Sequence, residues 1–325
     1  MGPLMWVADA TGQDLFAVTD FTLDHAEGTG KGAECDFELS FRADAAGRAR
    51  TLSGGELAYL EGTCVGGVVD SVQSAGGTMT YRGRTWGGVL AHKVIDPGDG
   101  HVTVSGGANA VVADVLSRCA LSGLMAASGD ASGLTVPTTD LERFCTAWEG
   151  LWQALSAAGA RLSMVRWQGG PVTLSAVPRA MRELAGELVS LDVTRARSVT
   201  NHLVCAGEGK GGERVRVDLY ADATGAVSET QTLFGADEVA ERYSFTSADR
   251  ARLVEDGTRR LRGHQALSSA KVTLPDGGGL ELGDVVRARD EATGLVAEAT
   301  VSKRVTKVRG GVMTVSWEAS GATVS

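Results

Sequence analysis

The sequence predicts a β-rich α+β protein in which strands dominate both ends of the chain and helices lie between them. Three observations lead to this prediction. Apolar and polar residues alternate in short runs near both termini, the spacing changes to that of amphipathic helices in the middle, and most of the 44 glycines separate short apolar runs. A chain of 325 residues is long enough to divide into two or three domains.

The first hundred residues are expected to form a small β-domain. Residues 35–41 ("CDFELSF") alternate without a break, which is typical of a strand with one buried face. Two further runs, at 67–73 and 78–86, are joined through "SAGG" and predict a hairpin. We therefore expect a first domain over residues 1–100.

Two amphipathic helices are expected in a second, α/β domain at residues 101–195. Their apolar stripes are Val111, Val112, Val115, Leu116 and Cys119 in the first helix, and Leu141, Phe144, Cys145, Trp148, Leu151, Trp152 and Leu155 in the second. Thr139 and Glu142 predict a capping box where the second helix begins, and Gly159 predicts its end. We interpret the aromatic stripe as core packing rather than as a binding face. A hairpin through "QGGP" follows.

The remaining residues, 196–325, predict a second β-domain that contains a helical insertion at about 236–268. Two helices are expected in the insertion, at 236–243 and at 247–267, with Ser247 as the N-cap of the longer one. The expected strands are "LVCAG" (203–207), "RVRVDLYAD" (214–222), "AKVTLP" (270–275), "LELGDVVRARD" (280–290), "GLVAEATVSKRVTKVRG" (294–310) and "GVMTVSWEA" (311–319).

One glycine-rich stretch raises the question of a bound nucleotide. Gly207, Gly209 and Gly212 match G-x-G-x-x-G, the spacing at which backbone amides hold a dinucleotide pyrophosphate. That site requires a helix after the third glycine, whereas the following residues alternate as in a strand. A Walker loop is also excluded, because Val204 stands where its first glycine is required. We interpret the stretch as a wide hairpin turn and expect no cofactor.

The composition argues against several other kinds of site. A net charge of -9 does not favour broad attraction to nucleic acid, which requires a basic face. The five cysteines lack C-x-x-C spacing, and the five histidines never occur four residues apart, so we expect buried thiols and no metal site. No stretch resembles a signal peptide or a membrane-spanning helix, so we expect synthesis in the cytoplasm and no membrane contact.

No catalytic motif is recognisable either. There is no G-x-S-x-G, and the S-x-x-K formed by Ser268 and Lys271 lacks its companion motifs. With forty acidic residues, a glycosidase-like carboxylate pair is possible, but nothing in the sequence singles one out. The chain also carries a basic strip formed by Lys303, Arg304, Lys307 and Arg309. We interpret this strip as the solvated face of a strand rather than as a site for an anionic partner.

Three stretches resemble the tail hub proteins of long-tailed bacteriophages and prophages, a family that includes the baseplate hub of contractile tails. They are residues 79–97, 199–227 and 280–318, and the resemblance extends from about residue 65 to the end of the sequence. The residues that carry it are Gly83, Trp86, Asn201, Gly207, Gly209, Arg214, Asp222, Gly225, Gly283 and Asp284. The resemblance implies that they have a structural role, and it gives no catalytic, cofactor-binding or metal-binding residue.

The resemblance implies a β-rich α+β fold with two small tail-tube-like β-barrels joined by the α/β insert. It implies a homotrimeric ring in the virion tail that connects the tail tube to the tip or spike and gives the genome a channel. The implied partners are further copies of the chain, the tail tube or distal tail protein, the tape-measure protein, and spike, tip or fibre proteins. DNA would pass without specific binding, and no enzymatic activity is expected.

Two alternatives compete with a structural hub. A tail-associated carbohydrate- or peptidoglycan-active enzyme requires a carboxylate pair in a cleft, one member having a raised pKa. A cell-surface binding module requires exposed aromatic side chains, and several of the six tryptophans lie on the helical stripe that we assign to the core.

Overall fold

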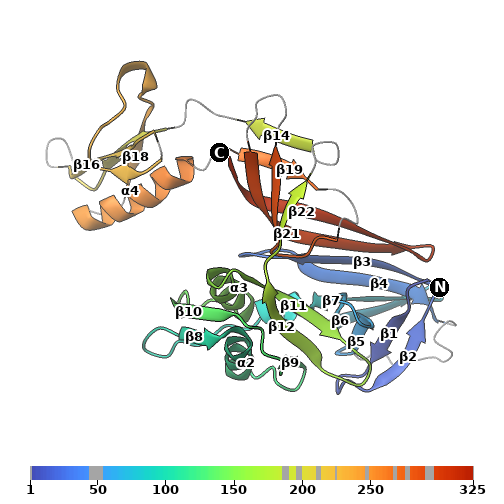
Figure 1. Ribbon diagram of the computed structural model, residues 1–325. Helices are drawn as coiled ribbons and strands as arrows, with labels where there is room; N and C mark the ends of the chain where they lie inside the picture. Colours follow the sequence, from blue (N-terminus) through green and yellow to red (C-terminus); the bar gives the residue numbers. More distant parts are fainter. Residues whose placement is uncertain are drawn as a thin grey trace. The chain divides into compact units, whose positions relative to one another are not determined.

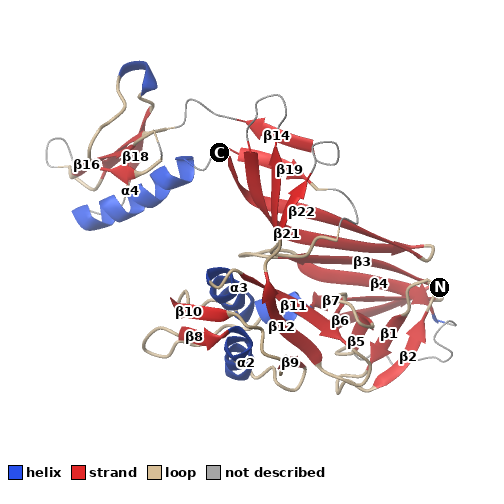
Figure 2. Ribbon diagram, viewed as in Figure 1, coloured by secondary structure: helices blue, strands red, loops and turns tan. Residues whose placement is uncertain are grey.

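Strands make up most of the regular structure, which confirms the β-rich class (Figure 2). The computed structural model describes residues 2–43, 54–184, 190–194, 200–209, 214–223, 225–245, 249–265, 269–274, 279–289 and 296–324. The chain forms two compact units. The larger contains Met1–Leu191 and Val272–Ala322, and the smaller contains Asp192–Lys271 and Thr323–Ser325.

These units divide the chain differently from the three consecutive ranges expected from the sequence, 1–100, 101–195 and 196–325. Strands from the two ends of the chain hydrogen-bond to each other, so the larger unit includes both ends. Sequence periodicity identifies strands but not the strand that each one pairs with, and this pairing determines the grouping.

In the N-terminal part of the larger unit, the described residues form seven strands and one short helix (Figure 1). They are β1 Met5–Ala8, β2 Asp14–Val18, β3 Phe21–Gly28, β4 Cys35–Arg42, β5 Leu57–Leu60, β6 Gly66–Ala75, β7 Thr78–Thr85 and α1 Trp86–Ala91. The expected hairpin is confirmed, since β6 pairs antiparallel with β7 across a Gly76–Gly77 turn. The burial of β4 also alternates as its sequence predicts.

The middle of the chain adds two small sheets and two helices to the same unit. Its elements are β8 Thr103–Gly107, α2 Ala108–Arg118, β9 Met125–Ala127, β10 Thr135–Asp140, α3 Ala147–Ala157, β11 Ala160–Arg166 and β12 Val172–Pro178. β11 pairs antiparallel with β12, which confirms the hairpin through "QGGP", and β9 pairs parallel with β12. The stripe expected on α2 is buried, as is Cys119, which follows the helix.

The start of α3 differs from the prediction. The capping box is formed by Thr146 and Glu149, which lie further along the chain than the expected pair Thr139 and Glu142. Residues 135–140 instead form β10, in which Thr139 pairs with Val104, so the residue expected to cap the helix belongs to a strand.

Most of the stripe expected on α3 lies in the core. Trp148, Leu151 and Leu155 are buried, but Phe144 lies before the helix and is 60% exposed. Gly159 has a φ of 63°, consistent with its expected place at the helix end.

The C-terminal strands complete the larger unit's main sheet. They are β13 Met181–Leu184, β14 Ser190–Thr194, β19 Ser269–Thr273, β20 Val285–Arg289, β21 Val296–Arg309 and β22 Val312–Val324. β21 pairs antiparallel with β3, so N-terminal and C-terminal strands belong to one sheet of 13 strands with the order β14-β19-β22-β21-β3-β4-β7-β6-β5-β1-β2. β20 pairs with β21 and β13 beside this path.

Two separate closed barrels are therefore not seen among the described residues. β3 uses the edge that would close an N-terminal barrel to pair with β21, and this pairing merges the two strand sets. The described residues of this unit include two apolar cores. One is formed mainly by α1, α2, α3 and β11–β12, and the other lies between the strands β1 to β7, with Val308 of β21.

The smaller unit contains a four-stranded sheet and a helix. Its elements are β15 His202–Ala206, β16 Arg216–Ala221, β17 Val227–Ser228, the short 3-10 helix η4 Gly235–Asp237, β18 Ala240–Ser244 and α4 Arg250–Gln265. The expected long helix is confirmed as α4, although Ser247, its expected N-cap, is outside the described residues. The expected helix at 236–243 is wrong: its second half belongs to β18, which pairs parallel with β15, and only the short η4 lies at its start.

Candidate functional site

The candidate functional site is the central part of the large sheet, where strands from both ends of the chain meet. We call the run β6-β7-β4-β3-β21-β22 the central sheet (Figure 1). Along each of its strands, alternate side chains point to opposite faces. One face covers the buried core, and the other, the polar face, carries charged side chains of both signs.

Cross-strand ion pairs organise this polar face. Arg82 on β7 pairs with Glu38 on β4 at 2.6 Å, and Lys303 on β21 pairs with Glu34 at 2.6 Å. Arg309 also contacts Asp24 on β3. Each of these pairs is largely exposed and contributes at most about 1 kcal/mol to stability. Their main effect is that positive and negative charges are interspersed across the face.

The basic strip expected at the end of the chain is therefore only partly correct. Lys303, Lys307 and Arg309 share the polar face, because every second residue of a strand points to the same side. Arg304 points to the opposite face and is 4% exposed. The odd-numbered residues are partly or fully solvated, whereas Arg304 belongs to a buried polar cluster.

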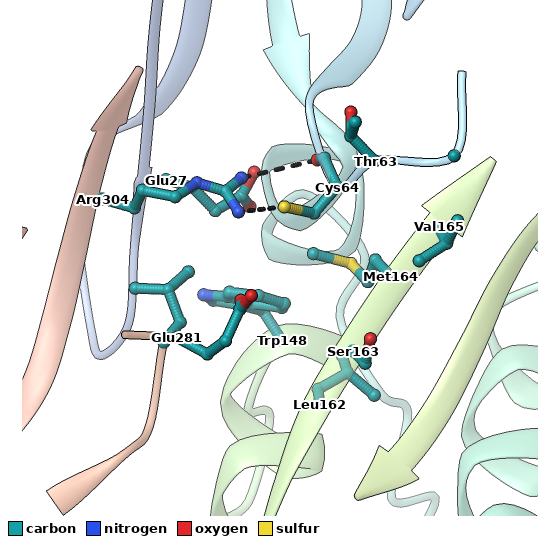
Figure 3. Close-up of a pocket in the computed structure, with 12 residues that line it drawn as sticks. Glu27, Thr63, Cys64, Trp148, Leu162, Ser163, Met164, Val165, Glu281 and Arg304 are labelled. Carbon is teal, nitrogen blue, oxygen red and sulfur yellow. Dashed lines mark hydrogen bonds between the residues drawn. The ribbon is translucent and has the colours of Figure 1, made fainter. Parts of the chain in front are cut away.

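This buried cluster lines a cavity of about 290 Å³ at the junction of the N-terminal strands, the insert and the C-terminal strands (Figure 3). Glu27 reaches the cavity from β3, Arg304 from β21, and Cys64 from the loop before β6. Figure 3 shows the Arg304 and Cys64 side chains pointing toward each other, where the guanidinium Nη1 contacts Sγ. Trp148 of α3 lies on the facing side and donates from Nε1 to the Gly28 carbonyl at 3.0 Å.

Burial shifts the ionisation of the groups in this cluster. Glu27 is fully buried, and burial raises its pKa to about 7, although the nearby Arg304 charge opposes the shift. Burial and Arg304 lower the pKa of His25 to about 3, so its ring is neutral near pH 7. Burial also raises the pKa of the Cys64 thiol. The arrangement therefore disfavours a reactive thiolate and joins three parts of the chain through polar contacts.

The sequence pattern does not single out this cluster. It places Arg304 in a solvated strip, and nothing distinguishes Glu27 among the forty acidic residues or Cys64 among the five cysteines. A signal was present in β3, since His25 and Glu27 fall on the alternate positions of Leu23, which is buried. Charged residues at apolar strand positions indicate buried polar contacts.

Gly83 and Trp86, two residues of the family resemblance, lie at the end of β7 and the start of α1. A Cβ at Gly83 would lie 1.9 Å from the Val68 carbonyl oxygen of the neighbouring strand. Trp86 is fully buried directly after Thr85, whose hydroxyl accepts from the Gly88 N–H at 3.2 Å. Both residues hold the turn from strand to helix.

Gly283 and Asp284 form the turn before β20. Gly283 has a φ of 88°, and a Cβ there would lie 2.6 Å from the Trp152 ring. Asp284 is 1% exposed, accepts from the Ala180 N–H at 3.1 Å and forms an ion pair with Arg161, whose Nε lies 3.0 Å from Oδ1. It thereby joins the insert to the C-terminal strands.

The other six residues of the resemblance lie in the smaller unit. Asn201 precedes β15, donates to the Asp237 carbonyl at 2.6 Å and accepts from the Val239 N–H at 2.9 Å. Asp222 and Gly225 make the turn after β16, where Asp222 Oδ1 accepts from the Ala226 N–H at 3.0 Å. These contacts support backbone turns.

The glycine stretch connects two antiparallel strands, β15 and β16, which confirms the hairpin interpretation. The Gly207 N–H donates to the Val215 carbonyl at 2.8 Å, and Arg214 donates from Nε to the Gly207 carbonyl at 2.6 Å. Gly209 has a φ of 122°, but Gly207 does not have a positive φ. Gly212 is outside the described residues.

The smaller unit also contains a histidine cluster that no motif in the sequence predicts. His202 Nδ1 lies 2.6 Å from Glu238 Oε1, and its Nε2 lies 3.0 Å from Asp218 Oδ1. Its ring stacks on Tyr220 with centroids 4.3 Å apart. The cluster ties the segment before β18 to β15 and β16.

In the described part of the chain, no three His, Cys, Asp or Glu side chains are placed to hold a metal ion. None of the helices that the structure describes has both the length and the apolar character to cross a membrane. Ser268, from the isolated S-x-x-K match, is outside the described ranges.

No protein-family model matches this sequence, and no curated protein matches it. Solved structures do. The 43 kDa tail protein of prophage MuSo2 from Shewanella oneidensis matches over 98% of both chains, with a TM-score of 0.50 and 13% identity. A tail protein from Neisseria meningitidis MC58 matches over 98% of this chain and 97% of that one, with a TM-score of 0.48 and 14% identity.

A chain of the phage P2 baseplate also matches over 98% of each chain, with a TM-score of 0.42 and 12% identity. The structural neighbours named here are thus described as tail proteins or as part of a baseplate. At 13% identity, the match to the Shewanella oneidensis protein shows the fold. The chain has the β-rich fold of a prophage tail protein.

Proposed function

We propose that this protein is a structural hub at the baseplate or tip of a phage or prophage tail. In this proposal it forms a homotrimeric ring that connects the tail tube to the tip or spike and encloses a channel for the genome. The observation that carries the proposal is the pairing of β3 with β21 within a tail-protein fold. Through this pairing, one subunit contributes two strand sets to one continuous sheet.

The two strand sets share a hairpin design, which supports two tube-like units per subunit. The β6–β7 turn is Gly76–Gly77, with φ values of 56° and 77°, and the β21–β22 turn is Gly310–Gly311, with φ values of 55° and 76°. Both turns lie at the same end of the central sheet, because the intervening strands alternate in direction. A trimer would present six such hairpins.

The polar face supports a role as the wall of the channel. A surface that holds DNA by releasing counterions needs an excess of basic side chains. Here Arg82, Lys303 and Arg309 are each next to a carboxylate, so they do not form an unopposed basic track. Such a wall lets DNA pass without specific binding.

The same proposal places the protein in the virion tail after synthesis in the host cytoplasm. Its partners are the tail tube or distal tail protein, the tape-measure protein, and spike, tip or fibre proteins. We further propose that it is not an enzyme. The carboxyl with the most strongly raised pKa, Glu27, is enclosed rather than exposed in a cleft, unlike the acid of a glycosidase.

The test is an early stop codon in this gene within the phage or prophage that carries it, with complementation by a tagged copy. We expect lysates without complete tails, and, after complementation, label at the tail end away from the head. Normal numbers of infectious particles without the protein would reject a structural hub. Clearing of peptidoglycan by the purified protein would favour the enzymatic alternative.

A further inference from the structure

The loop between β17 and β18, residues 229–239, is attached to the smaller unit by polar contacts rather than by an apolar core. The structure describes every residue of this loop, and none of them is buried; Phe234 is 64% exposed. None of them packs against the apolar cluster between the four-stranded sheet and α4. Figure 2 shows η4 within the loop, which leads into β18. The position of the loop therefore depends on a few hydrogen bonds.

Asn201 and His202 hold the end of the loop that leads into β18. The Asn201 side chain bonds to two backbone groups of the loop, at 2.6 and 2.9 Å. Nδ1 of His202 lies 2.6 Å from Oε1 of Glu238, which belongs to the loop. Nε2 of the same ring lies 3.0 Å from Oδ1 of Asp218 on β16. One imidazole ring thus lies between two carboxylates, one on the loop and one on the sheet.

This arrangement requires a proton on each nitrogen of the ring. A neutral imidazole has one N–H and one lone pair, whereas the charged form has two N–H groups. With a neutral ring, one lone pair would face a carboxylate oxygen at hydrogen-bonding distance, which is repulsive. Both contacts of His202 are therefore favourable together when its ring is charged. Histidine is the side chain that ordinarily gains or loses its charge between about pH 5 and 8.

Of the two carboxylates, Asp218 is fixed more firmly than Glu238. Asp218 lies within β16, and its carboxylate accepts two hydrogen bonds of 2.8 Å from Arg216. Burial acts to raise the pKa of Asp218, but the hydrogen bonds from Arg216 and His202 outweigh it and lower that pKa. Glu238 lies in the loop and can turn toward solvent. A neutral ring therefore keeps its proton at Nε2, on the Asp218 side, and loses the contact with Glu238.

We propose that His202 is a pH-dependent latch for the loop at residues 229–239. The charged ring holds Glu238 and fixes the loop on the four-stranded sheet. Loss of the Nδ1 proton as the pH rises releases Glu238 and lets the loop move. The latch lies within the smaller unit and does not depend on the hub proposal.

Other titratable and charged groups surround the ring without taking over this role. Tyr220, on which the ring stacks, stays neutral near pH 7, because burial raises the pKa of its hydroxyl. Arg242 on β18 shares the sheet face of His202 and keeps its charge throughout. Glu241 points to the other face, where it pairs with His264 of α4 at 3.3 Å. His264 is therefore a second histidine beside a carboxylate of the same unit, but on the opposite face.

Amide hydrogen exchange of the loop, expressed as protection relative to the intrinsic rate at each pH, tests the latch. Protection of the Glu238 and Val239 amides should fall about tenfold between about pH 5.5 and 8, as expected for the loss of one hydrogen bond to a charged group. The amides of β15 and β16 should keep their protection, which shows that the unit stays folded. Nitrogen NMR of the His202 ring should show two protonated nitrogens at the lower pH and a proton at Nε2 alone at the higher pH.

Three glutamine variants separate the latch from a merely structural contact. In Glu238→Gln, the new amide can donate to a neutral Nδ1 and can accept from a charged ring, so the loop should stay protected at both pH values. His202→Gln removes the charge and should leave the loop weakly protected at both. His264→Gln is the matched control, because it removes the histidine on the opposite face, and it should keep the wild-type pH dependence.

Equal protection of the wild-type loop at the two pH values overturns the proposal, as does wild-type pH dependence in Glu238→Gln. A neutral ring that keeps its proton at Nδ1 also overturns it, and so does loss of the pH dependence in His264→Gln. None of these results bears on the hub. A stop codon that abolishes tails would retain the hub even if the latch is rejected, and intact tails would reject the hub even if the latch is found.

Discussion

Arg304 and Glu27 stand directly opposite each other where β21 pairs with β3, and both side chains are buried. They bring a guanidinium and a carboxyl group to the place where N-terminal and C-terminal strands join. Because the two strand sets meet through this pair of strands, the charge of the cluster affects the stability of the whole larger unit.

We predict that Glu27→Gln changes how stability depends on pH. The pKa of Glu27 is raised by burial from 4.5 to about 7, so the folded state keeps a proton that the unfolded state releases between these values. The stability that this group contributes is present below about pH 4.5 and is lost as pH rises toward 7. Relative to the wild type, the variant should gain up to roughly 3 kcal/mol over this interval. Urea unfolding across the interval measures the gain.

The matched control is Glu38→Gln, which removes an exposed carboxylate that pairs with Arg82 on the polar face. It should change stability by less than about 1 kcal/mol at any of these pH values. His25 acts in the opposite direction, because its pKa is lowered from 6.5 to about 3 and its contribution is lost as pH falls. Parallel pH profiles for the Glu27 variant and the wild type would contradict the assignment.

Gly83→Ala is expected to destabilise the protein by about 3 kcal/mol, because the new methyl group would meet the Val68 carbonyl of the neighbouring strand. Gly100→Ala is the control, since a Cβ there has no atom within 4 Å and its φ is not positive. That change should remain within about 0.5 kcal/mol of the wild type. Equal melting temperatures for the two variants would show that β7 can shift away from β6.

Asp284→Asn should cost roughly 2 to 3 kcal/mol, because Asp284 is buried and its carboxylate pairs with the Arg161 charge and accepts from two backbone N–H groups. Asp70→Asn, which removes the exposed partner of Arg84, should cost less than about 1 kcal/mol. Chemical denaturation of both variants makes the comparison. A neutral Asp284 variant would mean that the turn before β20 does not depend on this charge.

The two glycines of the β15–β16 turn are expected to respond differently to replacement by valine. The sequence predicts damage at both Gly207 and Gly209, but only Gly209 has the positive φ that a β-branched side chain resists. Gly209→Val should therefore be the more harmful change, by about 1 to 2 kcal/mol. Hydrogen exchange at the amides of β15 and β16 reports the effect locally, and equal protection in both variants would count against it.

No nucleotide should bind to the glycine stretch. A strand, β16, follows it instead of a helix, so no helix N-terminus is available to hold a phosphate group. Calorimetric titration with ATP, NAD and FAD is expected to show no binding heat. Saturable binding of any of the three that is abolished by Gly209→Val would contradict the hairpin assignment.

The sequence by itself determined the strand-rich class, both Gly–Gly hairpins and the strand after the glycine stretch. Each follows from contacts between residues close in the chain, such as the alternation of residues 35–41 and the positive φ that turns demand. It also predicted α2, α4 and the buried tryptophans of α3, because helical spacing places the apolar residues on one side of each helix.

Tertiary structure alone decided which strands became neighbours. Thr139 is expected to cap a helix and residues 240–243 to lie within one, yet pairing with β8 and β15 made them parts of strands. The burial of Arg304 likewise depends on β3, which lies far away in the sequence. Local helix or strand propensity contributes tenths of a kcal/mol per residue to stability, whereas strand pairing and burial stabilise whole strands at once. Long-range contacts therefore decided where the two ends of this chain meet.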